Sequence, residues 1–234
     1  MPTIELTFPY WDDVGGTIRG HRVFTACRTV DGRIFRLEDH LDRLYRSATG
    51  IFMTPPMPKE ELRPLLEETV RRNRQVHPGV DLLINVVFSG GLEGCTMKKS
   101  SGTAHLYIAV QELMPPPPVY YEEGVALATF PHQRIYPDLK LLNYVGAIVA
   151  HQTVIPQHKA YEVLFVCPVD RQTILEGSTF TIFFVDSSGE IVTPPLDGRI
   201  LDSITRRALV ELLASGKSVR LKEVAIRIEQ IPSF

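Results

Sequence analysis

The first half of the chain alternates between short apolar runs and helical periods. Residues 23–37 hold two β-prone runs, VFTACRTV and RIFRL, separated by Asp31-Gly32, a pair typical of a tight hairpin turn. From Leu37 the apolar positions recur every three or four residues, which predicts a helix that ends near the prolines at 55–58. We expect a second helix from about Lys59 to Gln75, and then strands at 82–88 and 104–110.

The proline run MPPPP at 114–118 interrupts this pattern, since proline lacks the amide donor that a helix or a central strand requires. Beyond it, the pattern predicts strands and helices joined irregularly, which favours an α+β fold over a doubly wound parallel sheet. We therefore expect one domain over 1–113, a linker at 114–118 and a second domain over 119–234. The elements expected after the linker are strands at 124–130, 163–169, 180–186 and 219–226, and helices at 141–155 and 204–214.

Composition narrows the functional classes. The 234 residues are 44% hydrophobic and 22% charged, which is typical of a globular protein. The net charge of -2, without blocks of like charge, argues against nucleic acid or an anionic membrane as a partner. The N-terminal residues lack the pattern of a secretory signal, and no apolar run approaches the roughly 18 residues of a membrane span, so we expect a cytoplasmic protein.

The three cysteines, Cys27, Cys95 and Cys167, are widely spaced. This spacing fits neither a disulfide framework nor a metal site, so we expect them to be small buried residues and expect no bound metal.

Lys140 is the first candidate for chemistry, because it lies among leucines in PDLKLLNY. Its aliphatic stem could simply pack on apolar surface while the ammonium reaches water. Alternatively, burial keeps a fraction of the amine neutral, and a neutral amine can form a Schiff base with an aldehyde. The local pattern does not separate these two interpretations.

Three further segments carry candidate groups with equally ordinary alternatives. Glu176, in ILEGSTFTIFFV, could face the nitrogen of a pyridinium ring or could be a turn residue in water. The helix expected from Ile204 could bind a phosphate at its start or could merely be capped by its hydroxyl residues. Arg43, in EDHLDRLYRSA, could contact the phosphate or lie on a solvated helix face.

The order and spacing of these segments resemble the class IV aminotransferases, also called fold type IV pyridoxal-phosphate enzymes. This family includes branched-chain and D-amino-acid aminotransferases and aminodeoxychorismate lyase. The resemblance implies a homodimer whose chain has a small N-terminal α/β domain and a larger C-terminal pseudo-barrel domain. Five segments carry it: VFTACRTVDGRIFRLEDHLDRL, YPDLKLLNY, ILEGSTFTIFF, TPPLDGRILDSITR and IEQIPSF.

The resemblance also implies roles for single residues. Lys140 is the implied Schiff-base lysine, which also moves the α-proton of the substrate, and Glu176 lies beneath the pyridine nitrogen. Tyr144 hydrogen-bonds the phenolic oxygen of the cofactor, and Phe24 and Arg28 help to form the substrate pocket and its entrance. The remaining implied cofactor residues are Arg43, Ile204 and Thr205 at the phosphate, and Ser178 and Thr179 in the E-G-S-T segment.

The expected reaction moves an amino group between an amino acid and a 2-oxo acid. Family members usually continue past the IPSF segment, so we expect a C-terminal domain that is shortened. The substrate motifs of the best-known branches are absent from LLINVV and FSGGLEGCTMKKS, which leaves Arg28, Lys98 or Lys99 to bind a carboxylate. Two alternatives stay open: a lyase of the aminodeoxychorismate type, and a truncated relative that binds the cofactor without turnover.

Overall fold

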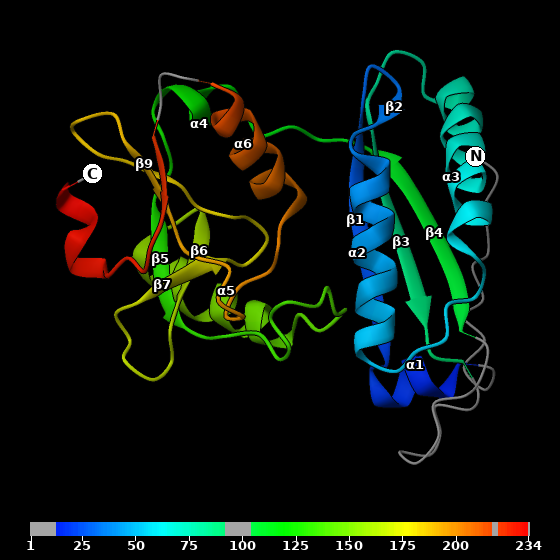
Figure 1. The fold of residues 1–234 in the computed structure, drawn as a ribbon, viewed down its shortest axis with the longest axis horizontal. Coiled ribbons are helices and arrows are strands. Elements are labelled where there is room, and N and C mark those ends of the chain that lie inside the picture. The colour runs from blue at the N-terminus through cyan, green and yellow to red at the C-terminus, as the bar shows by residue number, and fades with distance from the viewer. Residues whose placement is uncertain (1–12, 92–103, 217–219, 234) are drawn as a thin grey trace. The chain divides into compact units, whose positions relative to one another are not determined.

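The computed structural model describes residues 13–91, 104–216 and 220–233. Contacts divide the chain into two compact units, which are described separately below (Figure 1). Unit 1 comprises Met1–Met114 with Leu139–Asn143, and unit 2 comprises Pro115–Asp138 with Tyr144–Phe234. The domain limits expected from the sequence stay a prediction.

Unit 1 is a four-stranded antiparallel sheet with the strand order β2-β1-β3-β4, and the helices α2 and α3 pack on it. Its elements in chain order are α1 (Val14–Arg19), β1 (Arg22–Val30), β2 (Arg33–Ile34), α2 (Leu37–Gly50), α3 (Lys59–Val76), β3 (Leu82–Ser89) and β4 (His105–Glu112).

The hairpin expected at Asp31-Gly32 is confirmed. Val30 pairs with Arg33, and the two residues between them have positive φ angles of 51° and 77°. Positive φ at both central positions matches the right-handed twist of the two strands, and Asp-Gly tolerates it better than most pairs. The local sequence thus determines this turn.

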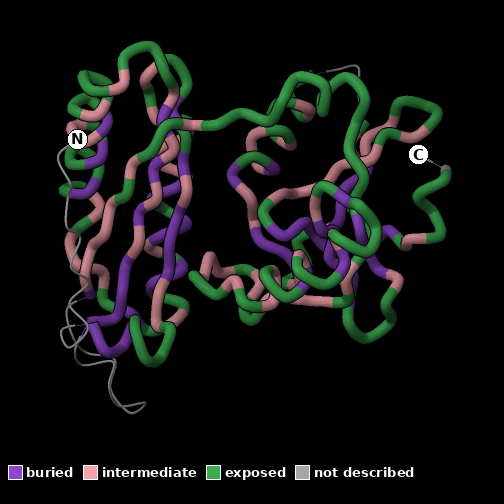
Figure 2. The backbone as a smooth tube through the Cα atoms, turned by 180° about the vertical axis from the view of Figure 1, so that it is seen from behind, coloured by how far each residue is buried: buried purple, intermediate pink, exposed green. Residues whose placement is uncertain are grey.

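The core of unit 1 lies between the sheet and its two helices. Every second residue of β3 is fully buried there, from Leu82 to Phe88, whereas Leu83, Asn85 and Val87 are only partly buried (Figure 2). The apolar run at 82–88, which we expected to be a buried strand, therefore buries one face completely and the other in part. The reason is that both helices of unit 1 that join this core contact the same face of the sheet.

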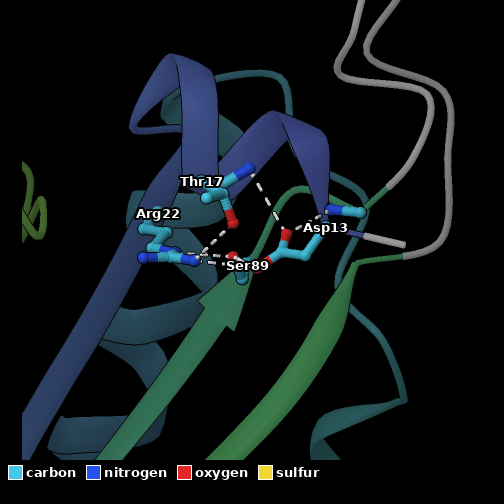
Figure 3. Close-up of polar contacts among 6 residues, drawn as sticks. Asp13, Thr17, Arg22 and Ser89 are labelled. Atoms are coloured by element: carbon cyan, nitrogen blue, oxygen red, sulfur yellow. Dashed lines mark hydrogen bonds and ion pairs between the residues drawn. The ribbon is translucent and has the colours of Figure 1, made fainter. Parts of the chain in front are cut away.

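A buried carboxylate ties α1 to the ends of β1 and β3 (Figure 3). Asp13 caps α1 by accepting from the amide of Gly16, and it also accepts from Arg22, Ser89 and the amide of Gly91. Burial alone would raise the pKa of the Asp13 carboxyl, but the hydrogen bonds from Ser89 and Arg22 outweigh it and lower the pKa below its usual value. The carboxylate is fully buried and ionised.

The segment Leu139–Asn143 packs on unit 1 as an extended piece of chain. Leu141 forms an antiparallel bridge with Val23 of β1, and the amide of Leu142 donates to the carbonyl of Arg22 at 3.1 Å. The helix expected from Leu141 therefore begins later, at Val145, and the sequence-based start was wrong. Pairing with β1 fixes these backbone groups in an extended conformation, which a local period of apolar residues does not reveal.

Unit 2 contains two three-stranded sheets with the orders β5-β6-β7 and β10-β9-β8, each with one parallel and one antiparallel pair. Separate clusters of buried residues lie at the two sheets. The elements are α4 (Val119–Glu122), β5 (Leu127–Pro131), α5 (Val145–His158), β6 (Glu162–Val166), β7 (Ile174–Gly177), β8 (Phe184–Val185), β9 (Ile191–Thr193), α6 (Ile204–Ser215), β10 (Leu221–Glu223) and the 3-10 helix η2 (Ile228–Ser233).

The strand expected at 180–186 is largely absent, because only Phe184–Val185 pairs in a sheet. The preceding backbone has other partners: the carbonyl of Phe180 accepts from Gly177, and that of Ile182 accepts from the Thr193 hydroxyl. The helices expected near 59–75 and 204–214 are confirmed, with ends shifted by one residue. None of the helices within the described ranges is long and apolar enough to cross a membrane.

Two of the three cysteines are buried as expected, with Cys27 2% and Cys167 8% exposed. Burial raises the pKa of the Cys27 thiol to about 12, although the charge of Arg43 opposes the rise. Cys95, Lys98 and Lys99 lie outside the described residues.

Candidate functional site

Lys140 is held to unit 1 through its backbone. Its amide donates to the hydroxyl of Ser47 at 3.0 Å, and its carbonyl accepts from the amide of Phe24 at 3.0 Å. Its side-chain amine lies 4.8 Å from the centre of the Phe24 ring, within the range of a cation–π contact. The residue as a whole is partly buried.

Arg43 lies on the face of α2 that packs against β1, and only 4% of the residue is exposed. Its guanidinium donates to the hydroxyl of Thr25 on β1 at 3.0 Å. The same hydroxyl lies 2.7 Å from Nδ1 of His40, one turn earlier on α2. The sequence-based alternative of a solvated helix face is therefore wrong for Arg43, because the apolar stripe of α2 turns this residue inward.

The buried imidazole of His40 is electrically neutral over the physiological range. Burial is the main reason that its pKa falls from 6.5 to about 3, and the positive charges of Arg43 and Lys140 lower the pKa further. Asp39 opposes the shift without reversing it. The inner face of α2 therefore presents one cation and one neutral ring.

Ser47 connects this helix with Lys140. Its hydroxyl donates to the carbonyl of Arg43 at 2.8 Å and accepts from the amide of Lys140. Since a hydroxyl has one proton and two lone pairs, both bonds form at once. One fully buried serine thus links the backbones of the two residues proposed for cofactor chemistry in unit 1.

Phe24 and Arg28 are four residues apart on β1, so their side chains leave the sheet on the same face. Phe24 is 7% exposed. About half of the Arg28 side chain is exposed, and its guanidinium is 3.6 Å from the carboxylate of Asp81. Arg28 is thus an accessible cation with an acidic neighbour.

In unit 2, Glu176 near the end of β7 is a buried carboxylate with both oxygens engaged. One oxygen accepts from the guanidinium of Arg134 at 2.5 and 3.0 Å, and the other accepts from the amide of Leu201 at 3.2 Å. The residue is 6% exposed. The alternative of a turn glutamate in water is therefore wrong, because burial and Arg134 replace the solvent.

The two hydroxyl residues after Glu176 differ in environment. Ser178 is buried and donates to Glu162 at 2.9 Å, and the ring of His151 lies 3.0 Å from the same hydroxyl. Thr179 is exposed. Ser178 therefore secures the turn that follows β7, whereas Thr179 faces outward.

The start of α6 matches the sequence-based expectation. Ser203 caps the helix by accepting from the amide of Arg206 at 3.4 Å, with Ile204 buried and Thr205 exposed behind it. The first amides of a helix have no partner within the helix and lie at the positive end of its dipole. Arg206 fixes this turn, since its buried guanidinium donates to the carbonyl of Pro194 and the carboxylate of Glu223.

Tyr144 precedes α5 as its N-terminal cap residue, and its carbonyl accepts from the amide of Ile148 at 2.8 Å. The residue is partly buried. The first turn of α5 thus fixes the backbone position of Tyr144.

These side chains are chemically suited to pyridoxal phosphate. The cofactor has an aldehyde, a phosphate and a ring nitrogen, which require an amine, anion-binding groups and a carboxylate respectively. Unit 1 contains the amine of Lys140 and the buried cation of Arg43. Unit 2 contains the buried carboxylate of Glu176 and the start of α6.

Sequence reasoning missed six polar residues that support these groups. His40 could have been found, because its spacing of three from Arg43 places both on one helix face. No local pattern announces the other five, since each bonds to a residue that is distant in the sequence. They are Thr25 and Ser47 in unit 1, and Arg134, His151 and Glu162 in unit 2.

Comparison with known proteins identifies relatives over most of the chain. A protein of Methanocaldococcus jannaschii with the provisional name branched-chain-amino-acid aminotransferase is 30% identical over 223 residues, which cover 92% of this chain and 73% of the relative. D-alanine aminotransferase of Listeria monocytogenes is 28% identical over 214 residues, which cover 87% of this chain and 68% of the relative.

Solved structures show the same fold. The PLP-bound form of a hypothetical aminotransferase from Mycobacterium tuberculosis superposes with a TM-score of 0.78 at 23% identity, covering 98% of this chain and 79% of the other. The mixed α/β architecture is thus that of the fold type IV aminotransferases. The sequence profile of amino-transferase class IV matches residues 22–234. The chain therefore belongs to the class IV aminotransferase family, whose enzymes use pyridoxal phosphate.

Proposed function

We propose that this protein is a pyridoxal-phosphate-dependent aminotransferase in which Lys140 binds the cofactor covalently. The observation that carries the proposal is the setting of Lys140. Both sides of its backbone are hydrogen-bonded to unit 1, its amine lies over an aromatic ring, and the buried cation of Arg43 belongs to the same unit. A surface lysine has none of these constraints.

Pyridoxal phosphate supplies an electron-accepting ring that stabilises negative charge at the α-carbon of a bound amino acid. The freed amine of Lys140 would take the proton from that α-carbon and deliver it to the cofactor carbon that carried the aldehyde, and it would move a proton in the opposite direction when the 2-oxo acid reacts. Glu176 keeps a proton on the ring nitrogen by presenting a fixed negative charge, and Arg134 holds that carboxylate in place.

The other proposed cofactor residues bind and orient. Arg43, the amide of Ile204 and the hydroxyl of Thr205 bind the phosphate, because a guanidinium and a helix start both favour anions. Tyr144 donates to the phenolic oxygen. Ser178 and Thr179 contact the rest of the cofactor. The hydrogen bond from Ser178 to Glu162 holds the Ser178 side chain in place.

The proposed substrates are an amino acid and a 2-oxo acid. The relatives named above support this class, since their names specify branched-chain amino acids in one case and D-alanine in the other. Phe24 lies at the apolar part of the proposed substrate pocket and Arg28 at its entrance, where an accessible guanidinium could bind a carboxylate.

We also propose that the enzyme is a cytoplasmic homodimer. Residues 1–113 form its small domain and 119–234 its cofactor-binding domain, joined by the proline-rich linker at 114–118. Membership of the class IV aminotransferase family supports the proposed domain division and assembly.

Reduction with borohydride tests the central proposal. The protein loaded with pyridoxal phosphate is reduced, digested and analysed by mass spectrometry. We expect the phosphopyridoxyl adduct on Lys140 and none after Lys140→Ala. Lys222→Ala is the matched control, since Lys222 is an exposed lysine paired with Glu190, and it should retain the adduct. An adduct that persists in Lys140→Ala, or none in the unmodified protein, would disprove the assignment.

A half-reaction identifies the type of chemistry. The loaded enzyme is mixed with single L- and D-amino acids, and the cofactor spectrum is recorded. An aminotransferase converts the cofactor stoichiometrically to pyridoxamine phosphate, whereas a lyase of the aminodeoxychorismate type releases pyruvate from its substrate without that conversion. A protein that binds the cofactor and does neither would be a relative without turnover.

A further inference from the structure

Three buried polar side chains meet between α2 and β1, beside Lys140. His40 and Arg43 are three residues apart on α2 and therefore share a face. Thr25 on β1 lies opposite both of them. The three residues are 6%, 4% and 1% exposed, so water does not set their orientations.

Donor chemistry fixes the direction of the hydrogen bond between Arg43 and Thr25. A guanidinium only donates, so the Thr25 oxygen accepts from Arg43 at 3.0 Å. The Thr25 oxygen also lies 2.7 Å from Nδ1 of His40, and since a hydroxyl has one proton and two lone pairs, either group can donate in this second bond. Burial and the positive charge of Arg43 keep the imidazole neutral, so His40 meets Thr25 as an uncharged partner.

A protonated His40 is unfavourable at this position. A protonated His40 would place a second positive charge beside Arg43 in a site closed to water, with Lys140 nearby. These are the causes that lower the pKa of His40 to about 3. Charge therefore keeps His40 neutral, and geometry makes Arg43 the donor to Thr25.

We propose that Thr25 and His40 are positioning residues for Arg43, which they hold in one orientation for binding a phosphate group. The proposal rests on the proposed function, in which Arg43 binds the phosphate of the cofactor. His40 fixes the rotation of the Thr25 hydroxyl, and Thr25 in turn fixes the guanidinium. Both partners are neutral, so they orient Arg43 without cancelling any of its positive charge.

Neutral partners suit an anion site for a physical reason. A carboxylate in the place of Thr25 would also orient the arginine, but it would compete with the phosphate for the same charge. A hydroxyl acceptor restricts the rotamers of the long side chain and leaves its electrostatic attraction intact. Thr25 and His40 should therefore increase the binding affinity only for ligands that carry a phosphate.

Binding measurements with two forms of the cofactor test this selectivity. The apoprotein is titrated with pyridoxal phosphate and, separately, with pyridoxal, which lacks the phosphate. Thr25→Val and His40→Leu should weaken binding of pyridoxal phosphate by about ten-fold or more, the range expected for hydrogen bonds to charged groups. Binding of pyridoxal should change by less than about two-fold, because the aldehyde and the ring do not require Arg43.

Conservative variants serve as matched controls. Thr25→Ser keeps the hydroxyl, and His40→Asn keeps a neutral side chain that can accept from or donate to Thr25, so both should restore most of the affinity. Inorganic phosphate should compete with pyridoxal phosphate for the unmodified protein and for these two variants, but weakly for Thr25→Val. Thermal unfolding of each variant checks that the fold is retained.

Each result decides the matter. Equal weakening of both cofactor forms in Thr25→Val, or no rescue by Thr25→Ser, would show a merely structural role and overturn this inference alone. An unmodified protein that binds neither form, and gives no borohydride adduct on Lys140, would overturn the proposed function and this inference with it.

Discussion

At the scale of single residues, burial decides which side chains carry charge. Asp13 and Glu176 are both buried, and each faces an arginine and a backbone amide that replace water. His40 is buried beside cations and remains neutral. Buried surroundings thus lower the pKa of both His40 and Asp13, the first through loss of water and the second through its hydrogen bonds.

His40 should make stability depend on pH. Its pKa is about 3 in the folded protein and near 6.5 in the unfolded chain, so only the unfolded chain takes up a proton between these values. The stability due to neutral His40 is full above pH 6.5 and is lost as the pH falls towards 3. We expect the free energy of unfolding to fall by about 2 kcal/mol from this group between pH 7 and pH 5.

Urea unfolding at several pH values measures this dependence. His40→Asn is the comparison, since asparagine does not titrate, and it should remove this part of the slope. An identical slope in both proteins would show that His40 does not titrate differently in the two states.

Glu176→Gln tests the electrostatic role of the carboxylate at the ring nitrogen. The amide has nearly the same shape but cannot hold a proton on the ring, so turnover should fall by about 100-fold or more. The dissociation constant of the cofactor should rise much less, by under about ten-fold, because the other contacts remain.

Steady-state kinetics gives the turnover rate of Glu176→Gln, and a cofactor titration of the same preparation gives its dissociation constant. Glu190→Gln, which loses a carboxylate paired with Lys222, is the matched control and should behave like the unmodified enzyme. Equal losses of rate and affinity in Glu176→Gln would contradict the proposed role.

At the scale of elements, one face of α2 organises the polar groups of unit 1. Residues 40, 43 and 47 recur at helical spacing and are all buried. These residues contact two separate pieces of chain. One is β1, which carries Thr25, and the other is the extended segment Leu139–Asn143, which carries Lys140. Substitutions on this face of α2 should therefore affect both β1 and the segment that carries Lys140.

Ser47→Ala should loosen the segment that carries Lys140. The change removes the acceptor for the Lys140 amide and leaves that buried donor unsatisfied, which costs about 1–2 kcal/mol. Urea unfolding should show this loss, and hydrogen exchange should speed up at the amide of Lys140. Ser215→Ala is the matched control, since it removes an exposed hydroxyl bonded to the carbonyl of Leu212, and it should change neither.

Asp13→Ala should destabilise the corner formed by α1, β1 and β3. The change leaves Arg22, Ser89 and the Gly91 amide without their shared acceptor, at a cost of about 3 kcal/mol in the free energy of unfolding. Asp42→Ala removes a surface carboxylate paired with Lys59 and should change stability little. Equal midpoints for the two variants would contradict the buried network.

At the scale of the whole molecule, the proposed homodimer predicts a definite mass. Sedimentation equilibrium should give twice the 26.3 kDa of one chain. The same measurement after removal of the cofactor shows whether assembly requires it. A single species at the mass of one chain, with the cofactor bound and the half-reaction intact, would exclude the dimer as a condition for activity.

Several features of the fold could be predicted because their signals are local. The Asp31-Gly32 turn, the helix periods of α2, α3 and α6, and the capping residue Ser203 each depend on a few neighbouring residues. The start of α5 could not be predicted, since pairing of Leu141 with Val23 overrides the local helical pattern. β8 is shorter than the sequence predicts because turn and side-chain hydrogen bonds occupy the backbone before it, and these contacts also override the local pattern.

By itself, the sequence determined the class of this protein and its principal candidate groups: a lysine among leucines, a glutamate after a buried strand, and an arginine on a helix. Only the tertiary structure decided their surroundings, such as Arg134 against Glu176, 42 residues apart, or Thr25 between His40 and Arg43. Periodicity and turn chemistry act within a few residues, whereas a hydrogen bond between distant residues exists only once the chain has folded.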